Sequence, residues 1–249
     1  MDRNDSVVII PMYNERENAA AIIDAVLKLD TEHAFDIIVI DDNSPDGTAA
    51  IVKDKMAQHP GRIAIIEREG KLGLGTAYIT GFKWALDHGY DYIFEMDADF
   101  SHNPNDLIKL YQATAYDGAD VAIGSRYVSG VNVVNWPMGR VLMSYYASKY
   151  VRCVTGMPIH DTTAGFVCYR AKVLRTIDLD AIKFKGYAFQ IEMKFTAYQF
   201  GFNITEVPII FINRVLGTSK MSSGIFGEAV FGVIRLKWNS FFKKYQRKE

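Results

Sequence analysis

The chain is organised around residues 92–104, which read Tyr92-Ile93-Phe94-Glu95-Met96-Asp97-Ala98-Asp99-Phe100-Ser101-His102-Asn103-Pro104. An apolar run that predicts a strand ends there in two carboxylates, Asp97 and Asp99, spaced two residues apart. Side chains two apart on a strand point to the same face, so both can reach one ligand at the carboxyl end of the strand, where open α/β sheets bind ligands. Mg²⁺ and Mn²⁺ prefer hard oxygen ligands, often one or two carboxylates completed by substrate phosphates. The stretch therefore predicts a metal and diphosphate site.

The Asp-x-Asp spacing is not specific by itself. The chain has a second copy, Asp178-Leu179-Asp180, which we expect only to lie near a helix end. A functional role is favoured for the first copy because it follows a strand and precedes the turn residues Asn103-Pro104.

Strands and helices alternate on both sides of this stretch. Further strands are predicted at residues 6–10, 36–40, 63–66, 120–124 and 204–212. Helices are predicted at 14–29, 48–58, from about 76 to 88, 105–116, from 186–193 onward, and 225–242. Asn14 with Glu17 three residues later resembles a capping box for the first helix. The alternation predicts an α/β fold with a mainly parallel central sheet and helices on both faces.

Polar residues follow two other predicted strands. Asp41 and Asp42 end the strand at 36–40, so in a parallel sheet they share an edge with Asp97 and Asp99. Carboxylates at such an edge commonly hold ribose hydroxyls, and a nucleoside diphosphate would use both acidic pairs. Arg126 follows the strand at 120–124, where its planar fork suits phosphate.

The glycine-rich loop at residues 70–76 matches neither the P-loop nor the dinucleotide fingerprint. We interpret it as a tight turn that permits close backbone approach, with or without a ligand contact.

Composition narrows the class of protein. The 249 residues are 49% hydrophobic and 23% charged, with a formal net charge of −1, which is typical of a globular domain and argues against nucleic-acid binding. The amino-terminal apolar run is too short for a signal peptide, and no run approaches the roughly 20 residues of a spanning helix. We therefore expect a cytoplasmic protein. Cys153 and Cys168 form no zinc or redox motif and are predicted to be small buried apolar residues.

The second half of the chain is rich in aromatic residues. Residues 136–151 combine aromatic residues and methionine with isolated cations, and the predicted helix at 225–242 is amphipathic and precedes the basic segment 243–248. An apolar face with Trp and Phe beside a basic tail suits a helix that lies in a membrane surface. The alternative is a helix packed on the core with a solvated end.

Seven motifs in this order resemble the dolichol (polyprenol) phosphate mannose synthases, which are inverting family-2 glycosyltransferases of the GT-A fold. The motifs span nearly the whole chain: Ile10-Pro11-x-Tyr13-Asn14-Glu15, Asp41-Asp42-Asn43-Ser44-Pro45-Asp46-Gly47-Thr48, Gly73-Leu74-Gly75-Thr76-Ala77-Tyr78, Met96-Asp97-Ala98-Asp99-Phe100-Ser101-His102, Gly124-Ser125-Arg126-Tyr127, Gly186-Tyr187-Ala188-Phe189-Gln190-Ile191-Glu192-Met193 and Arg214-x-x-Gly217-x-Ser219-Lys220. The resemblance implies transfer of mannose from GDP-mannose to a polyprenyl (dolichyl) monophosphate with Mg²⁺ or Mn²⁺.

The resemblance also implies roles for individual residues. The residues implied to bind GDP-mannose are Pro11, Tyr13, Glu15, Ile40, Asp42, Asp97, Ala98, Asp99, Arg126, Arg214 and Lys220. The implied metal ligands are Asp99 as the principal one, Asp97, and Ser101 nearby. The implied catalytic set is Asp97, Asp99, Arg126, Arg214 and Lys220, and Arg126 and Arg140 would meet the acceptor phosphate. The usual Gly-Phe-Arg of the family is Gly165-Phe166-Val167 here.

The chemistry needs no catalytic base, because a phosphate monoester with a second pKa near 6 is already anionic at neutral pH. We predict a catalytic domain at residues 1–221, with a nucleotide-sugar half at 1–127 and an acceptor half at 128–221, followed by a membrane-surface helix and tail at 222–249. Such a protein would lie on the cytoplasmic face of a membrane, through its own helix or a small membrane-anchoring subunit. Two alternatives are a relative that uses UDP-glucose and a non-catalytic sugar-nucleotide-binding scaffold, although the full set of polar residues speaks against the scaffold.

Overall fold

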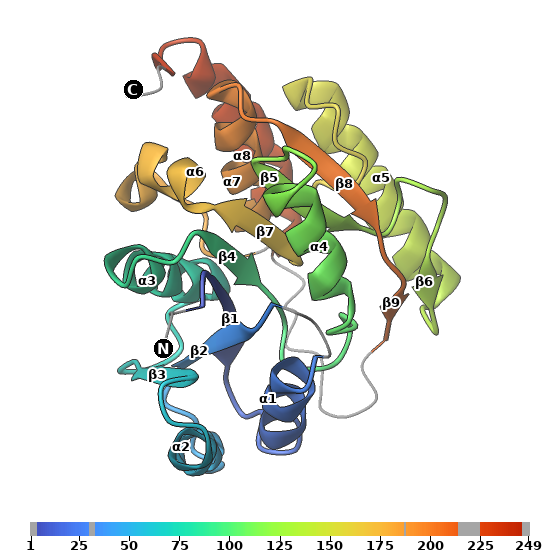
Figure 1. The fold of residues 1–249 in the computed structure, drawn as a ribbon. Coiled ribbons are helices and arrows are strands. Elements are labelled where there is room, and N and C mark those ends of the chain that lie inside the picture. Colours follow the sequence, from blue (N-terminus) through green and yellow to red (C-terminus); the bar gives the residue numbers. More distant parts are fainter. Residues whose placement is uncertain (1–3, 30–32, 187, 214–224, 246–249) are drawn as a thin grey trace.

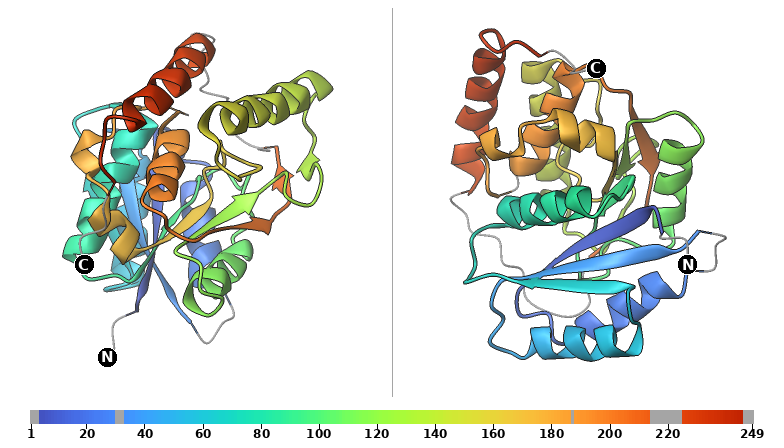
Figure 2. Two further views of the ribbon diagram at one scale, coloured as in Figure 1. Left: turned by 90° about the horizontal axis from the view of Figure 1, so that it is seen from above. Right: turned by 60° about the vertical axis from the view of Figure 1, so that its left-hand side comes forward.

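A seven-stranded sheet crosses the centre of the protein, with helices on both of its faces (Figure 1, Figure 2). The computed structural model describes residues 4–29, 33–186, 188–213 and 225–245, and of residues 225–230 the backbone only. In spatial order the strands of the sheet are β3 (Ile63–Glu67), β2 (Phe35–Asp41), β1 (Ser6–Met12), β4 (Tyr92–Glu95), β7 (Val167–Arg170), β5 (Val121–Ser125) and β8 (Ile204–Pro208). The helices are α1 (Ala19–Leu27), α2 (Thr48–Gln58), α3 (Leu74–Asp87), α4 (Asp106–Ala115), α5 (Met138–Thr155), α6 (Ala171–Thr176), the short 3₁₀ helix η1 (Leu179–Ala181), α7 (Ala188–Gln199) and α8 (Ile225–Ser240).

The sheet is mainly parallel, as predicted. The pairs β1–β2, β1–β4, β2–β3 and β5–β8 are parallel, whereas β7 is antiparallel to both of its neighbours, β4 and β5. Because β4 and β5 both oppose β7, they run in the same direction and end at the same edge of the sheet. The sequence analysis did not predict β7.

The sheet separates two apolar cores because successive side chains of a buried strand point to opposite faces. Val8 and Ile10 of β1 pack with α1, α2 and α4 on one face. Val7 and Ile9 pack with α3 and α7 on the other. Burial on both faces explains why these strands are continuous apolar runs rather than alternating ones.

The predicted strand at 204–212 is two strands. β8 ends at Pro208, and β9 (Phe211–Ile212) pairs with β6 (Val133–Val134) in a separate two-stranded sheet. Proline lacks a backbone N–H, so the ladder can stop there. The N–H of Ile209 still bonds the Ser125 carbonyl, and the chain then leaves the large sheet.

The predicted start of the first helix was wrong. Helix α1 begins at Ala19, and Asn14 has a positive φ of 53° that no helical residue adopts. The backbone N–H groups of Asn14 and Glu15 instead donate to Ser44 Oγ and Thr48 Oγ1, both at 3.0 Å. The apparent capping box is therefore a loop that is tied to the second acidic loop.

Two further expectations met mixed outcomes. Cys168 is buried as predicted, but Cys153 is exposed on α5. The second Asp-x-Asp copy lies at η1 after α6, where Asp180 forms a surface ion pair with Lys83. Among the described residues, no helix is both long enough and apolar enough to cross a membrane.

Candidate active site

Three acidic or polar loops meet at one edge of the sheet. The parallel register places Met12 beside Asp41 and Ile9 beside Glu95, so β1, β2 and β4 all end at this edge. The expectation that Asp41-Asp42 and Asp97-Asp99 share an edge is thereby confirmed. Arg126, which directly follows β5, lies at the same edge because β5 runs in the same direction as β4.

The loop after β4 holds the predicted carboxylates. Asp99 is buried, and its Oδ1 accepts a hydrogen bond from the Ser101 N–H at 3.0 Å. Asp97 is bound from two sides: its N–H donates to His102 Nδ1 at 3.4 Å, and Tyr78 donates to its Oδ1 at 3.5 Å. Asp99 is thus bound within its own loop, whereas the Asp97 carboxylate is bound by Tyr78 on α3.

His102 is a residue of the site to which the sequence analysis gave no role. Its ring stacks on Phe166 at 4.8 Å between centroids and meets Phe211 edge-on at 5.4 Å. Burial lowers the pKa of His102 to about 4, although the nearby Asp99 carboxylate opposes this effect. The imidazole is neutral at pH 7, so its Nδ1 can accept the Asp97 N–H. The motif around residues 96–102 contained this histidine, but only the fold shows what it contacts.

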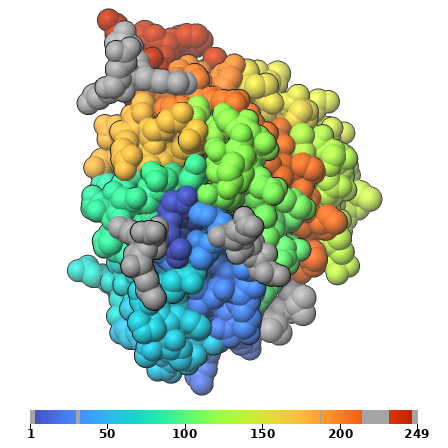
Figure 3. Space-filling model, in the orientation of Figure 1, coloured from blue at the N-terminus to red at the C-terminus, as the bar shows by residue number. Residues whose placement is uncertain are grey.

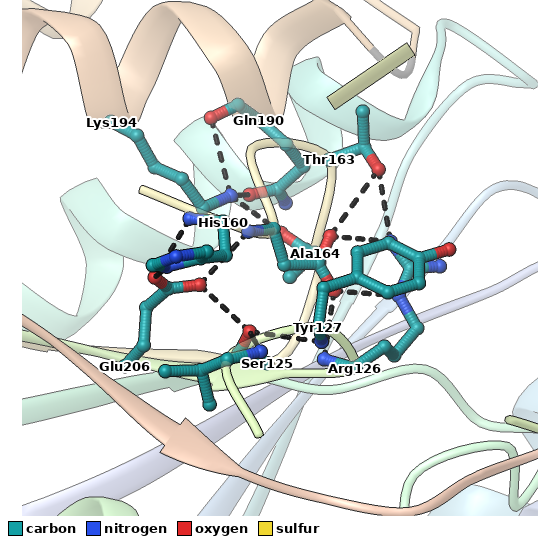
Figure 4. Close-up of polar contacts among 11 residues, drawn as sticks. Ser125, Arg126, Tyr127, His160, Thr163, Ala164, Gln190, Lys194 and Glu206 are labelled. Carbon is teal, nitrogen blue, oxygen red and sulfur yellow. Dashed lines mark hydrogen bonds and ion pairs between the residues drawn. The ribbon is translucent and has the colours of Figure 1, made fainter. Parts of the chain in front are cut away.

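Arg126 forms a buried two-point ion pair that the sequence did not reveal. Its Nε and Nη2 donate to the carboxylate of Asp161 at 2.7 and 2.6 Å, and Nη2 also donates to Thr163 Oγ1 at 2.9 Å (Figure 4). Burial alone would raise the pKa of Asp161, but the guanidinium outweighs it and the pKa is lowered. A phosphate at this place would thus meet an arginine whose charge is already compensated.

A second buried network lies beside this pair. Lys194 on α7 donates to the Ala164 carbonyl at 2.6 Å and to Gln190 Oε1 at 3.2 Å (Figure 4). Gln190 Nε2 in turn donates to Glu95 at 2.8 Å. Burial raises the pKa of Glu95 to about 8 and lowers that of Lys194 to about 8. The network links β4, two residues before Asp97, to the loop that carries Asp161.

Glu206 on β8 completes the support of the Asp161 loop. It accepts from Ser125 Oγ at 2.7 Å, from the Asp161 N–H at 2.8 Å and from the His160 ring at 2.8 Å (Figure 4). The sequence analysis named none of Asp161, Thr163, Lys194 or Glu206. Their types carried no local signal, since each acts through a partner that is distant in the chain.

The predicted nucleotide side of the site is built from the loops after β1 and β2. Tyr13 lies under the Lys71 ammonium at 5.2 Å, and Asn18 donates to Glu15 at 3.0 Å. Asp42 accepts from Arg68 Nε at 2.6 Å, and burial raises the pKa of this carboxyl despite the arginine.

Pro11 and Ile40 are each the last residue but one of their strands, β1 and β2. Pro11 is partly buried on β1. Ile40 is fully buried, and its side chain belongs to the core on the α3 face, so the structure offers no surface of Ile40 to a nucleotide. The side chain of Ile40 points from β2 into the core beneath α3 rather than toward the edge of the sheet.

The residues at 97–101 fit a divalent cation. Two carboxylates and the Ser101 hydroxyl are hard oxygen donors, which Mg²⁺ and Mn²⁺ prefer. Ser101 Oγ is buried and has no hydrogen-bond partner among the described residues. The described part of the chain holds no group of three or more His, Cys, Asp or Glu suited to a metal. Such a cation would therefore complete its shell with ligand oxygens, as is usual for Mg²⁺.

Two predicted residues, Arg214 and Lys220, lie outside the described residues. Arg140 on α5 donates to Asn213 at 3.1 Å, and its guanidinium lies over the Trp136 ring at 4.0 Å. Arg140 thus contacts the residue that directly precedes Arg214.

Comparisons with known proteins identify the family of the chain. The family model described as glycosyl transferase family 2 matches residues 7–178. The polyprenol monophosphomannose synthase of Mycolicibacterium smegmatis is 48% identical over 231 residues, which cover 92% of this chain and 85% of the relative. The undecaprenyl-phosphate mannosyltransferase of Micrococcus luteus is 47% identical over 229 residues, which cover 92% of each chain.

Solved structures show the same fold. Glucosyl-3-phosphoglycerate synthase from Mycobacterium tuberculosis, in complex with Mn²⁺, UDP and glucosyl-3-phosphoglycerate, matches with a TM-score of 0.67 at 16% identity, covering 96% of this chain and 80% of that one. The same enzyme with Mg²⁺ and UDP also gives 0.67, at 17% identity, covering 96% and 79%. At this identity the likeness shows the fold alone. The family match and the two close relatives show that the chain belongs to glycosyl transferase family 2, among the polyprenyl-phosphate mannose synthases.

Proposed function

We propose that the protein transfers mannose from GDP-mannose to a polyprenyl monophosphate with inversion, giving polyprenyl-phosphate mannose and GDP. The observation that carries the reaction type is the pair of anchored carboxylates, Asp97 and Asp99, at the edge shared by β1, β2 and β4. The acceptor class and the sugar rest on the names of the two relatives that are 47–48% identical.

The donor nucleotide would lie along the loops after β1 and β2. Tyr13 and Glu15 would contact the guanosine, and the buried ion pair of Asp42 with Arg68 supports the loop after β2. The diphosphate would then reach Asp97 and Asp99. A Mg²⁺ or Mn²⁺ ion held there by Asp99, with Asp97 and Ser101, would supply positive charge to the departing diphosphate.

The acceptor supplies its own nucleophile. An oxygen of the anionic phosphate monoester attacks the anomeric carbon on the face opposite to the diphosphate, the bond to that diphosphate breaks, and GDP leaves with the electron pair. No protein base is required, because the second pKa of the phosphate is near 6. The work of the protein is to hold two anions in line and to stabilise the charge on the leaving group.

Arg126 is suited to positioning rather than to neutralising the acceptor. Asp161 and Thr163 occupy its Nε and Nη2, whereas its Nη1 has no hydrogen bond to a described residue. Nη1 can therefore donate to a phosphate while Asp161 fixes the plane of the guanidinium. Arg140 would approach the same phosphate from α5, and Arg214 and Lys220 would approach the diphosphate from the segment after Asn213.

A membrane surface is the proposed location of the acceptor. Helix α8 packs through the buried Val233, while its exposed apolar side chains are Phe231, Ile234 and Trp238, and Phe241 and Phe242 follow it. Helix α5 exposes Met138, Leu142, Met143, Tyr145 and Tyr146. Figure 3 shows the red surface of α8 and the yellow surface of α5 along the upper margin of the molecule. An apolar surface with aromatic side chains, followed by the exposed Lys243 and Lys244, suits the cytoplasmic face of a membrane.

The division into a catalytic domain at 1–221 and a membrane-facing segment at 222–249 is part of the proposal. A small membrane-anchoring subunit is the alternative to direct attachment. Binding of the purified chain alone to anionic vesicles would exclude the need for such a subunit.

The test is sugar transfer to a polyprenyl phosphate in detergent. GDP-mannose and UDP-glucose are offered separately, each with Mg²⁺, with Mn²⁺ and with a chelator. Metal-dependent product from GDP-mannose alone supports the proposal. Product from UDP-glucose would change the assigned donor but not the proposed mechanism. The absence of product from both donors would favour a sugar-nucleotide-binding scaffold.

A further inference from the structure

A pocket of about 520 Å³ opens beside α5. It is lined by residues that include Tyr127, Tyr145, Lys149, Arg152, Cys153 and His160. None of its lining residues belongs to the two acidic loops. The reaction proposed above therefore leaves this pocket, the α5 pocket, without a role.

The charge of the α5 pocket is positive. Lys149 and Arg152 are one turn apart on α5, and neither forms an ion pair with a described carboxylate. No carboxylate is among the described residues that line the pocket. Glu206, which binds the His160 ring at 2.8 Å, is turned inward and its side chain is only 7% exposed. Two uncompensated cations on one wall of a pocket favour an anionic ligand.

The pocket shares α5 with exposed apolar and aromatic side chains. The rings of Tyr127 and Tyr145 meet edge-on at 5.6 Å within it, and Tyr145 is also 40% exposed. Leu142 and Tyr146 on the same helix are 48% and 59% exposed. A ligand that fills this pocket is thus anionic at one end and in contact with apolar and aromatic side chains at the other, which is the chemistry of a lipid at the membrane interface.

Arg126 and Arg140, which would meet the acceptor phosphate, are not among the described residues that line the α5 pocket. The Arg126 guanidinium lies 5.2 Å from the ring centre of Tyr127, whose residue also lines the pocket. A phosphate held by Lys149 and Arg152 would therefore occupy a place other than the one proposed for the acceptor phosphate. We infer that the α5 pocket binds the phosphate headgroup of an anionic membrane lipid, separately from both substrates. This inference does not depend on the identity of the sugar donor.

Cys153 makes the pocket measurable, because it lines the wall and is exposed. The second cysteine, Cys168, is fully buried, and burial raises the pKa of its thiol. N-ethylmaleimide should therefore modify Cys153 first, and intact-protein mass spectrometry gives the rate. The probes are dihexanoyl phosphatidylglycerol, dihexanoyl phosphatidylcholine, inorganic phosphate and farnesyl phosphate, the lipids below their micelle concentrations.

We expect phosphatidylglycerol at twice its dissociation constant to slow the modification about threefold, since only the unoccupied fraction reacts. Phosphatidylcholine should leave the rate unchanged. The variant Lys149→Gln/Arg152→Gln should lose the protection. The control is Arg175→Gln, which removes an exposed cation from α6, beside α3 and away from α5 (Figure 1), and should keep the protection.

Four results would overturn the inference. Equal protection by inorganic phosphate would mean that the pocket takes free phosphate rather than a lipid. Protection by farnesyl phosphate alone would make it a subsite of the acceptor. No protection by any probe, or protection that survives the Lys149→Gln/Arg152→Gln change, would remove the site; the transfer assay above is unaffected by each of these results.

Discussion

The acidic edge of the sheet and the surface of α5 and α8 differ in how they present their side chains. At the edge, Asp99 is 7% exposed and bonded to the main chain of its own loop. On α8, Phe231 is 76% exposed and Trp238 is 65% exposed. The first region fixes a few polar atoms in one geometry, as selective recognition of a sugar nucleotide requires. The second offers apolar area without fixed partners, as contact with a fluid lipid surface requires.

The difference predicts that single changes at the edge act strongly and single changes on the helices act weakly. The largest effect is expected for Asp161→Asn, which leaves the Arg126 charge buried without its partner. Breaking a buried ion pair from one side costs about 3–5 kcal/mol of unfolding free energy, measurable by urea unfolding. The double variant Arg126→Met/Asp161→Asn, which removes both charges, should recover much of this stability but not the transfer activity. An unchanged unfolding midpoint in Asp161→Asn would show that the pair contributes nothing to the fold.

The next effect concerns turnover. Asp99→Asn should lower kcat by about 10²–10³, the typical cost of losing one charge-stabilising group in a transition state. The fold should persist, because the amide oxygen can still accept the Ser101 N–H. Asp180→Asn in the second Asp-x-Asp copy is the matched control and should transfer at the normal rate. Near-normal turnover in Asp99→Asn would refute the metal assignment.

A smaller effect is expected on membrane binding. Trp238→Ala/Phe242→Ala should weaken co-sedimentation with anionic vesicles about tenfold, which is about 1.4 kcal/mol and less than the full burial of two aromatic side chains would contribute. Deletion of residues 241–249 should weaken it as well. Tyr116→Ala on the α4 side, where the tyrosine is 75% exposed, is the control for loss of an exposed aromatic side chain. Equal weakening by all of these changes would remove the membrane role of α8.

The smallest effect is a pH dependence that comes from Glu95. Its folded pKa of about 8 lies above the ordinary value, so its contribution to stability is full below about pH 4.5 and is lost as pH rises toward 8. Glu95→Gln mimics the protonated side chain and should remove this dependence. The natural chain should therefore lose at least 1.4 kcal/mol of unfolding free energy relative to the variant between pH 5 and pH 8, roughly the equivalent of one pKa unit. A constant difference across this range would show that Glu95 is ionised in the folded protein.

Much of the fold was predictable because its signals are local. β1 and β2 appear as β-branched runs, α2 was predicted with its observed bounds, and the acidic ends of β2 and β4 fall at one edge once the strands are parallel. The two wrong or missing elements depended on contacts between distant parts of the chain. The predicted helix start at Asn14 was wrong because the Asn14 N–H bonds to Ser44, 30 residues away. Strand β7 was missed because it is inserted antiparallel between β4 and β5, and that strand order is not written in any local pattern.

The site divides in the same way. By itself the sequence determined that Asp97 and Asp99 follow a strand on one face, because strand periodicity and turn residues act over a few positions. Only the tertiary structure decided that Arg126 is paired with Asp161, 35 residues away, and that Lys194 reaches the carbonyl of Ala164, 30 residues away. These partners are chosen by which strands and loops become neighbours across the sheet, and no local pattern in the chain encodes that choice.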